Sequence, residues 1–97
     1  MVVFSKSTIT QFAEEYPDAL EALMKWYRIT KVADWSCFAD VKKDFNAADA
    51  VGNDRFVFDI KGNHYRLVAL IFFNKRTVMI RFVGTHKEYD KIDVKKV

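Results

Sequence analysis

The stretch that decides the fold is RFVFDIKGNHYRLVALIFFNKRTVMIRFV, from Arg55 to Val83. Its β-branched, aromatic and aliphatic residues fall into three short runs, which two turn signals separate, Gly62-Asn63 and Asn74-Lys75. The middle run is almost continuously apolar, which is typical of a strand buried on both faces. We therefore predict a three-stranded antiparallel meander over Arg55–Ile60, Tyr65–Phe73 and Thr77–Val83.

A short strand and a first helix are predicted before this meander. Val2-Val3-Phe4 is β-prone and indicates a first or edge strand. Thr8 and Gln11 have the spacing of a capping box, in which each side chain bonds the other residue's backbone amide where a helix begins. The helix should end near Tyr16, because Pro17 disfavours helical geometry in the residue before it.

A second helix is predicted from Pro17 to about Val32, since proline suits a first helical turn. Apolar side chains recur along it at helical spacing, at Leu20, Leu23, Met24 and Tyr27. A third, short helix capped by Ser36 is expected next, and residues 46–54 are interpreted as a loop. The predicted fold is α+β, in one domain of residues 1–97, with N-terminal helices on one face of a small antiparallel sheet.

Composition narrows the class of protein. The chain is 51% hydrophobic, which favours a folded globular domain. The sequence has no apolar run of the ~18 residues that a membrane-spanning helix needs, and its first residues do not resemble a signal peptide. Cys37 stands alone, so no internal disulfide can form, and we expect a cytoplasmic protein without a membrane partner.

Charge is unevenly distributed along the chain. Residues 1–50 hold six Lys or Arg against eight Asp or Glu, whereas residues 51–97 hold ten against five. A basic half is expected of a phosphate-binding surface, although such an excess can equally arise by chance.

Two-residue turns would bring two arginines together. They pair Asp59 with Arg66 in the first hairpin and Arg66 with Val83 in the second. Arg66 and Arg81 would then be diagonal neighbours on one face, with Cα atoms roughly 7–8 Å apart. Two guanidinium groups aimed at one place suit a bound anion such as a phosphate.

The residues after Gly84 would add proton-transfer groups to this pair. His86 and Tyr89 should lie just beyond the same end of the sheet, where Lys61 and Asn63 occupy the first turn. Arginines can stabilise the charge that builds on a phosphorane, and His or Tyr can move the proton. The pattern indicates phosphodiester cleavage, without a metal if the 2′-hydroxyl of RNA is the nucleophile.

Ordinary structural roles are alternatives at this point. Asp59 and Arg66 could form a simple cross-strand ion pair, and a longer second turn would put Arg81 on the opposite face. His86 could merely hydrogen-bond a loop, and His64 could be exposed in its turn. The tail is interpreted as a solvated basic end, with Lys91, Lys95 and Lys96. One Cys and two His give no zinc-site spacing.

Two segments closely resemble the HigB family of toxins. They are KGNHYRLVALIFF, Lys61 to Phe73, and IRFVGTHKEYDKID, Ile80 to Asp93. The segments TQFAEEYPDALEALMKWY and KVADWSCFADVKKDF resemble the family's helical region, so the likeness covers nearly the whole chain. These toxins belong to bacterial type II toxin–antitoxin systems and to the wider RelE/ParE superfamily.

The resemblance implies a RelE-like α+β fold and a metal-independent, cofactor-free endoribonuclease. Such an enzyme would cut translated mRNA in the ribosomal A site, where the mRNA 2′-hydroxyl attacks the adjacent phosphate. The implied protein partner is a HigA-type helix-turn-helix antitoxin, so that operator DNA is contacted only through the antitoxin.

The resemblance, taken with the register, selects eight site residues. The predicted catalytic residues are Arg66, Arg81, His86 and Tyr89. The predicted contacts to RNA or the ribosome are Lys61, Asn63, Arg76 and Lys87. This sheet carries fewer lysines than many RelE-type sites, which leaves the individual roles open. A ParE-like gyrase inhibitor and a non-catalytic RNA- or ribosome-binding module are the alternative functions.

Overall fold

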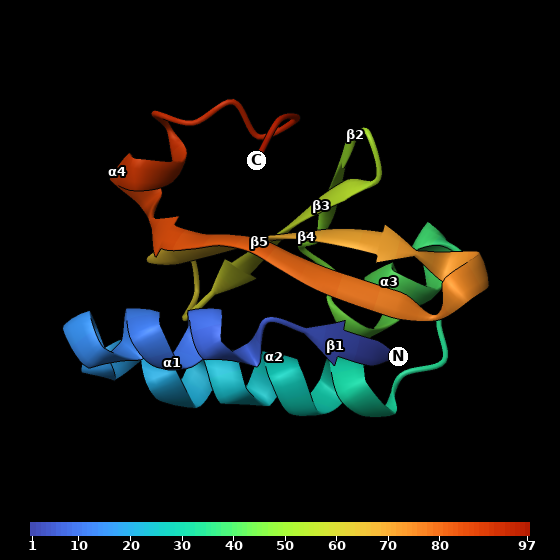
Figure 1. The fold of residues 1–97 in the computed structure, drawn as a ribbon, viewed down its shortest axis with the longest axis horizontal. Coiled ribbons are helices and arrows are strands. Elements are labelled where there is room, and N and C mark those ends of the chain that lie inside the picture. Colours follow the sequence, from blue (N-terminus) through green and yellow to red (C-terminus); the bar gives the residue numbers. More distant parts are fainter.

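Five strands form one sheet in the computed structural model, which describes residues 1–97 (Figure 1). They are β1 (Val2–Phe4), β2 (Asp49–Gly52), β3 (Arg55–Ile60), β4 (Tyr65–Phe72) and β5 (Thr77–Thr85). Their order across the sheet is β1-β5-β4-β3-β2, in which β1 runs parallel to β5 and all other neighbours are antiparallel. The predicted meander is confirmed as β3, β4 and β5.

Two long helices cover one face of this sheet. The helical segments are α1 (Lys6–Glu15), the 3₁₀ turn η1 (Pro17–Ala19), α2 (Leu20–Val32), α3 (Phe38–Asp44), the 3₁₀ turn η2 (Phe73–Lys75) and α4 (His86–Tyr89). Helices α1 and α2 lie side by side below the sheet in Figure 1, whereas α4 and the tail lie above it. The predicted α+β class is confirmed. None of the helices combines the length and apolar character needed to cross a bilayer.

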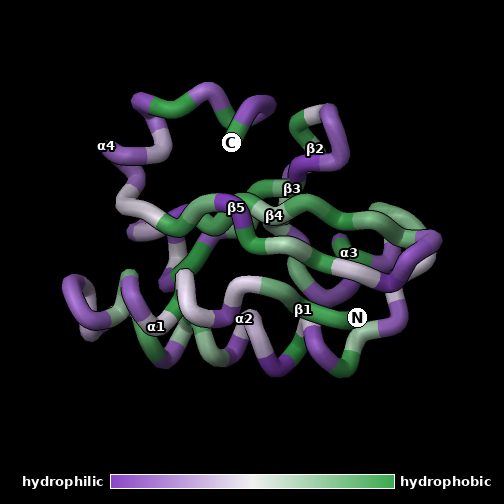
Figure 2. Tube along the Cα trace, in the orientation of Figure 1, coloured by the Kyte–Doolittle hydropathy of each residue, from purple (hydrophilic) through white to green (hydrophobic).

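The main core lies between α1, α2 and the sheet. Trp26 of α2 is buried and meets Phe58 of β3 edge to face, with ring centroids 5.4 Å apart. Alternate residues of β4 face the same core, namely Tyr65, Leu67, Ala69 and Ile71. Figure 2 shows the corresponding pattern, in which colours alternate along α1 and α2 and hydrophobic colour dominates β4 and β5.

The helix starts differ from the prediction. Helix α1 begins at Lys6 without a side-chain cap, because the amide of Thr8 already donates to the carbonyl of Ser5 at 2.9 Å. The predicted Thr8–Gln11 capping box is therefore wrong. Helix α3 likewise has Cys37, and not Ser36, at its N-cap position. The boundary before Pro17 is confirmed, since α1 ends at Glu15.

Residues 46–54 are only partly a loop, because β2 lies within them. Asp49 and Ala50 pair with Val57 and Phe56 of β3, and a bulge follows between Ala50 and Gly52. Asp, Ala and Gly all have low intrinsic strand propensity, so pairing with β3 decides the conformation of this segment.

The C-terminal tail is tied to the sheet by its backbone. Arg55 of β3 donates to the carbonyl of Val97 from Nε at 3.1 Å and from Nη2 at 2.6 Å. Asn53 donates to the carbonyl of Lys95 at 3.4 Å. The tail lysines are exposed, as predicted, but the segment crosses the face of the sheet that α1 and α2 leave free (Figure 1). We call this face the outer face.

Candidate functional site

A β-bulge in β5 changes the predicted pairing of the two arginines. The first hairpin has the predicted register, with Asp59 opposite Arg66. The second hairpin, between β4 and β5, has the predicted register from its turn to the pair Ala69–Ile80. Beyond that pair the register shifts by one residue, so that Val68 faces Phe82 and Arg66 faces Gly84. The predicted pairing of Arg66 with Val83 is therefore wrong. Arg81 is the extra residue of the bulge, which places it one residue farther from Arg66 along β5 than predicted.

Gly84 makes room for the groups that surround Arg66. A Cβ atom at this position would lie 2.4 Å from Cζ of the Phe82 ring and 3.2 Å from Cβ of Glu88. With a Cβ atom at this position the Phe82 ring would have to move aside, and Glu88 would have to shift by a few tenths of an ångström. The absence of a side chain at Gly84 therefore allows α4 to pack closely on the end of β5 beside Arg66.

The stretch THKEYD is a capped helical turn, which the sequence reasoning missed. Thr85 accepts a hydrogen bond from the amide of Glu88 at 3.1 Å, and the Glu88 carboxylate accepts one from the amide of Thr85 at 2.8 Å. Both halves of a capping box are present. The Thr-x-x-Glu spacing at residues 85–88 is the sequence signal that could have predicted α4.

Arg66 is held in place by the protein around it. Its Nε lies 3.2 Å from Oδ1 of Asp59, and its Nη1 donates to the carbonyls of Asn63 at 3.0 Å and Tyr65 at 3.3 Å. The cross-strand ion pair considered above as an alternative therefore does form. Only 14% of the Arg66 side chain is exposed, and Nη2 has no protein partner. The result is a fixed guanidinium with one free edge.

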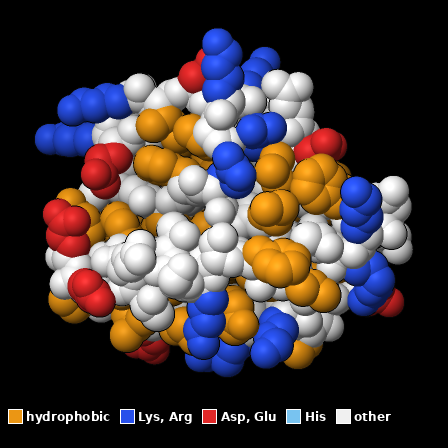
Figure 3. All heavy atoms as spheres, viewed as in Figure 1, with side chains coloured by type: hydrophobic (Ala, Val, Ile, Leu, Met, Phe, Trp, Pro, Cys, Tyr) orange, Lys and Arg blue, Asp and Glu red, His pale blue; other side chains and the backbone are white.

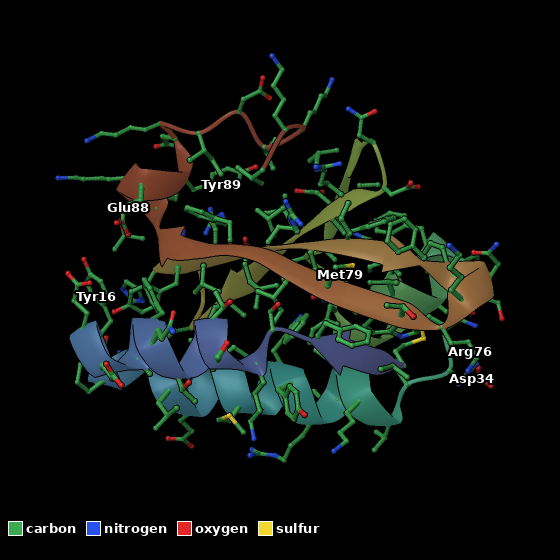
Figure 4. The ribbon with its side chains drawn as sticks, in the orientation of Figure 1. Tyr16, Asp34, Arg76, Met79, Glu88 and Tyr89 are labelled. Carbon is green, nitrogen blue, oxygen red and sulfur yellow. The ribbon has the colours of Figure 1, made fainter.

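Tyr89 lies against this guanidinium. Cζ of Arg66 is 5.9 Å from the centroid of the Tyr89 ring, within cation–π range. Tyr89 projects from α4 over the outer face of the sheet (Figure 4). Burial raises the pKa of its hydroxyl, against the opposing effect of Arg66, and Asp49, Asp90 and Asp59 raise it further. Tyr89 is thus protonated at neutral pH and can donate a proton or a hydrogen bond.

His86 begins α4 and has a carboxylate partner one turn later. Its Nδ1 lies 3.2 Å from Oδ2 of Asp90, and about half of the imidazole is exposed. The backbone amide of His86 donates to the carbonyl of His64 at 3.2 Å, which ties α4 to the β3–β4 turn. Asp90 was not among the predicted site residues, although its position four residues after His86 on a helical turn could have indicated it.

The predicted RNA contacts are in different places. Lys61 donates to Oδ2 of Asp18 at 2.8 Å, and the carbonyl of Asn63 holds Arg66, so both belong to the β3–β4 turn beside the site. Lys87 is exposed on α4. Arg76, by contrast, lies at the opposite end of β5, where it forms an ion pair with Asp34 (Figure 4). The structure does not bring Arg76 together with the other predicted residues.

The largest cavity lies on the other side of the first turn. It has a volume of about 330 Å³ and is bounded by α2, the end of α3 and the β3–β4 turn, with Trp26 and Lys61 among its lining residues. Neither Arg66 nor His86 lines it. Asp59, the ion-pair partner of Arg66, does line it, so the cavity adjoins these groups without holding the guanidinium.

Sequence comparison relates the chain to known toxins. A family model described as HigB_toxin, a RelE-like toxic component of a toxin–antitoxin system, matches residues 19–92. An "mRNA interferase HigB" of Escherichia coli O6:H1 is 31% identical over 94 residues, which cover 95% of this chain and 91% of that protein. The "mRNA interferase toxin HigB" of Escherichia coli K12 and the "mRNA interferase HigB" of Shigella flexneri are each 51% identical over 35 residues, 36% of this chain and 34% of theirs.

Proposed function

Because the chain belongs to the HigB family of RelE-like toxins of toxin–antitoxin systems, we propose that it is an mRNA endoribonuclease that cuts beside Arg66. The observation that carries the proposal is the fixed guanidinium of Arg66. It has a free Nη2 and lies against a protonated tyrosine, at the end of the sheet where α4 presents His86. A fixed cation with one free edge fits a phosphate of a polymer chain.

The reaction needs no reactant beyond the RNA. The 2′-hydroxyl loses its proton to a base, its oxygen forms a bond to the adjacent phosphorus, and the bond from phosphorus to the 5′-oxygen breaks. The departing 5′-oxygen takes a proton from an acid. The products are a 2′,3′-cyclic phosphate and a 5′-hydroxyl, and charge builds on the phosphorane between them. Nη2 of Arg66 would stabilise that charge.

The proton-transfer roles fall to α4. His86 would exchange protons with the reacting oxygens, while Asp90 orients the ring through Nδ1 and leaves Nε2 for the substrate. Tyr89 would donate to a phosphate oxygen or to the leaving group, since its raised pKa keeps it protonated. Exposed Arg81 would contact the RNA backbone beside the reacting phosphate, and Lys87 on α4 would do the same.

Residues 1–97 would act as one toxin domain in the cytoplasm. The mRNA would be cut in the ribosomal A site, with Lys61 and Asn63 of the first turn close to RNA or ribosome. The antitoxin that the family implies would be of the HigA type, with a helix-turn-helix through which the complex reaches operator DNA. No cofactor is required for the transesterification.

A reconstituted translation system tests the proposal directly. Purified protein is added to a defined mRNA with and without ribosomes, and cleavage is mapped by primer extension. We expect discrete stops on translated mRNA and a cyclic phosphate at the new 3′ end. Intact mRNA under translation arrest would contradict the nuclease proposal. Cutting without ribosomes would contradict ribosome dependence alone.

A further inference from the structure

Half of the outer face is apolar and uncovered. Alternate residues of β4 and β5 point to this face, and so do the ends of β1. Around Val57 and Val68 the face is buried, because α4 and the tail pass over that half (Figure 1). Towards β1 no segment of the chain covers it. Figure 3 shows hydrophobic side chains exposed along the half of β5 that lies away from α4.

The register places five apolar side chains together in this open half. Phe4 faces Met79, which faces Leu70, so that one row crosses β1, β5 and β4. The next row runs from Val2 through Thr77 to Phe72. We call these residues the β1 patch, defined as Val2, Phe4, Leu70, Phe72 and Met79. Met79 is seen on the front of β5 in Figure 4.

The residues of the β1 patch are exposed to solvent in part or by half. Phe4 is 51% exposed and Val2 is 55% exposed, and the other three members are partly exposed. β1 is also an edge strand, with β5 as its only neighbour in the sheet. A contiguous apolar surface beside a free sheet edge marks an interaction site, because water contact with it is unfavourable.

Charge around the β1 patch indicates what would cover it. Lys75 lies over the ring of Phe72, with Nζ 5.8 Å from its centroid, and Arg81 is exposed at the bulge on the other side. Neither cation has an ion-pair partner in the protein, whereas Arg76 nearby is neutralised by Asp34. An apolar surface between two free cations is complementary to an apolar segment that carries carboxylates.

We propose that the β1 patch is the docking surface for the antitoxin, which would bring to it an apolar row flanked by acidic residues. The existence of the partner rests on the proposed toxin function; of the residues used here, only Arg81 is also proposed to contact RNA. The β1 patch and Arg66 lie toward opposite ends of the sheet. Docking here leaves the guanidinium of Arg66 free of direct contact with the bound segment.

Calorimetry with the antitoxin encoded beside the toxin gene tests this surface. The double variant Phe4→Thr/Met79→Thr keeps strand-forming side chains and removes the largest apolar groups. We expect its Kd for the antitoxin to rise roughly 30-fold or more, as for central anchors of an interface. The matched control is Val32→Thr, since Val32 is 85% exposed on α2, outside the patch. Its Kd should stay at the wild-type value.

Charge reversal gives a second test of the partner's chemistry. Lys75→Glu should weaken antitoxin binding and reduce its salt dependence, whereas Lys91→Glu on the exposed tail should do neither. In cells, the double variant should still arrest growth but should no longer be neutralised by the co-expressed antitoxin. Binding by calorimetry is read without RNA, so a failure of the nuclease proposal would not disturb it.

Three results would overturn the assignment. One is wild-type antitoxin affinity of the double variant. The second concerns self-association. If light scattering shows that the wild-type toxin is a dimer, and the double variant is a monomer with unchanged affinity for the antitoxin, the patch is a dimer interface. The third applies if the double variant lacks a cooperative melting transition. Antitoxin affinity is then measured for the single variants Phe4→Thr and Met79→Thr, and wild-type affinity of both would overturn the assignment.

Discussion

The two turns of the meander are built alike but are used differently. Residues 61–64 join β3 to β4, and residues 73–76 join β4 to β5. Each turn holds a cation with a positive φ, 53° at Lys61 and 52° at Arg76. Each cation forms an ion pair, Lys61 with Asp18 of η1 and Arg76 with Asp34 in the loop between α2 and α3.

The difference lies in what docks on each turn. The amide of His86 donates to the carbonyl of His64, so α4 packs on the first turn and brings Tyr89 to Arg66. The second turn receives only the N-terminal strand, through the bond from the amide of Val2 to the carbonyl of Arg76. Basic residues in turns are therefore a poor guide to the site, because both cations serve the fold. The docked C-terminal segment distinguishes the two turns.

The largest expected effect comes from removing the imidazole that α4 brings to the first turn. His86→Ala should slow mRNA cleavage by about 10²–10⁴-fold, the usual range for a lost general acid or base. The matched control is His64→Ala, because His64 bonds α4 through its backbone carbonyl and its Nδ1 lies 2.9 Å from the carbonyl of Lys61 in its own turn. Cleavage is followed by primer extension and growth arrest. Wild-type toxicity of His86→Ala, with antitoxin binding retained, would show that the histidine has no part in the reaction.

Arg66→Ala should be nearly as damaging, with a fall in cleavage of about 10²–10³-fold, as for one electrostatic donor to a transition state. Arg66→Lys keeps the charge but loses the fork of donors, so it should recover only part of the rate. Arg76→Ala at the second turn breaks a more exposed ion pair, away from the site, and should change cleavage by less than a few-fold. Equal losses at the two arginines would contradict a site confined to the first turn.

Much of the sheet could be predicted, because turn chemistry and apolar runs fix local pairing. The Gly62-Asn63 turn fixed the register that pairs Asp59 with Arg66. The bulge at Arg81 could not be foreseen, since a single extra residue in an apolar strand leaves no local pattern. The bulge changes which residue faces Arg66. The predicted spacing of Arg66 and Arg81, which assumed regular pairing of β4 with β5, is therefore wrong by one residue.

The positions of the predicted site residues could be foreseen only in part. His86 and Tyr89 were expected just beyond the end of the sheet that holds the first turn, and the structure places them there, beside His64 and Arg66. Their position on a capped helical turn needed the Thr85–Glu88 pattern, which was overlooked. Arg76 was predicted as an RNA contact with them, but it lies at the opposite end of β5, where it pairs with Asp34. Strand β2 was missed because its conformation depends on pairing with β3.

Gly84→Ala should show that the packing of α4 on the sheet is tight. The added methyl group would meet the Phe82 ring, so we expect the free energy of unfolding to fall by about 1–3 kcal/mol. Cleavage should fall too, because α4 is displaced from Arg66. Urea unfolding measures the first effect, and Phe82→Leu in the same chain should restore part of it by removing the ring.

Gly62→Ala is the matched change in the first turn. Its Cβ would meet nothing within 4 Å, so only the positive φ of 66° opposes it, at a cost of about 1–2 kcal/mol. The folded Gly62→Ala variant should cleave mRNA at close to the wild-type rate. If Gly84→Ala left both stability and cleavage unchanged, α4 would have to be loosely packed on β5.

The smallest effect is a difference between the two turns in how stability depends on pH. Hydrogen bonds from Lys61 and Tyr65 lower the pKa of Asp18, and the bond to Asp18 helps raise the pKa of Tyr65 to about 12. The lowered pKa of Asp18 adds stability above its unfolded pKa, which is lost as pH falls through the folded value. The raised pKa of Tyr65 adds stability below pH 10, which is lost as pH rises from 10 to about 12.

Asp18→Asn should therefore flatten the stability profile at both extremes of pH. At the second turn, Arg76 lowers the pKa of Asp34 in the same way, but no tyrosine donates to this carboxylate. Asp34→Asn should flatten the acid limb alone and leave the alkaline limb as in wild type. Urea unfolding at a series of pH values measures both limbs. An alkaline limb that Asp18→Asn leaves unchanged would mean that the Tyr65–Asp18 bond does not hold the first turn to the helical layer.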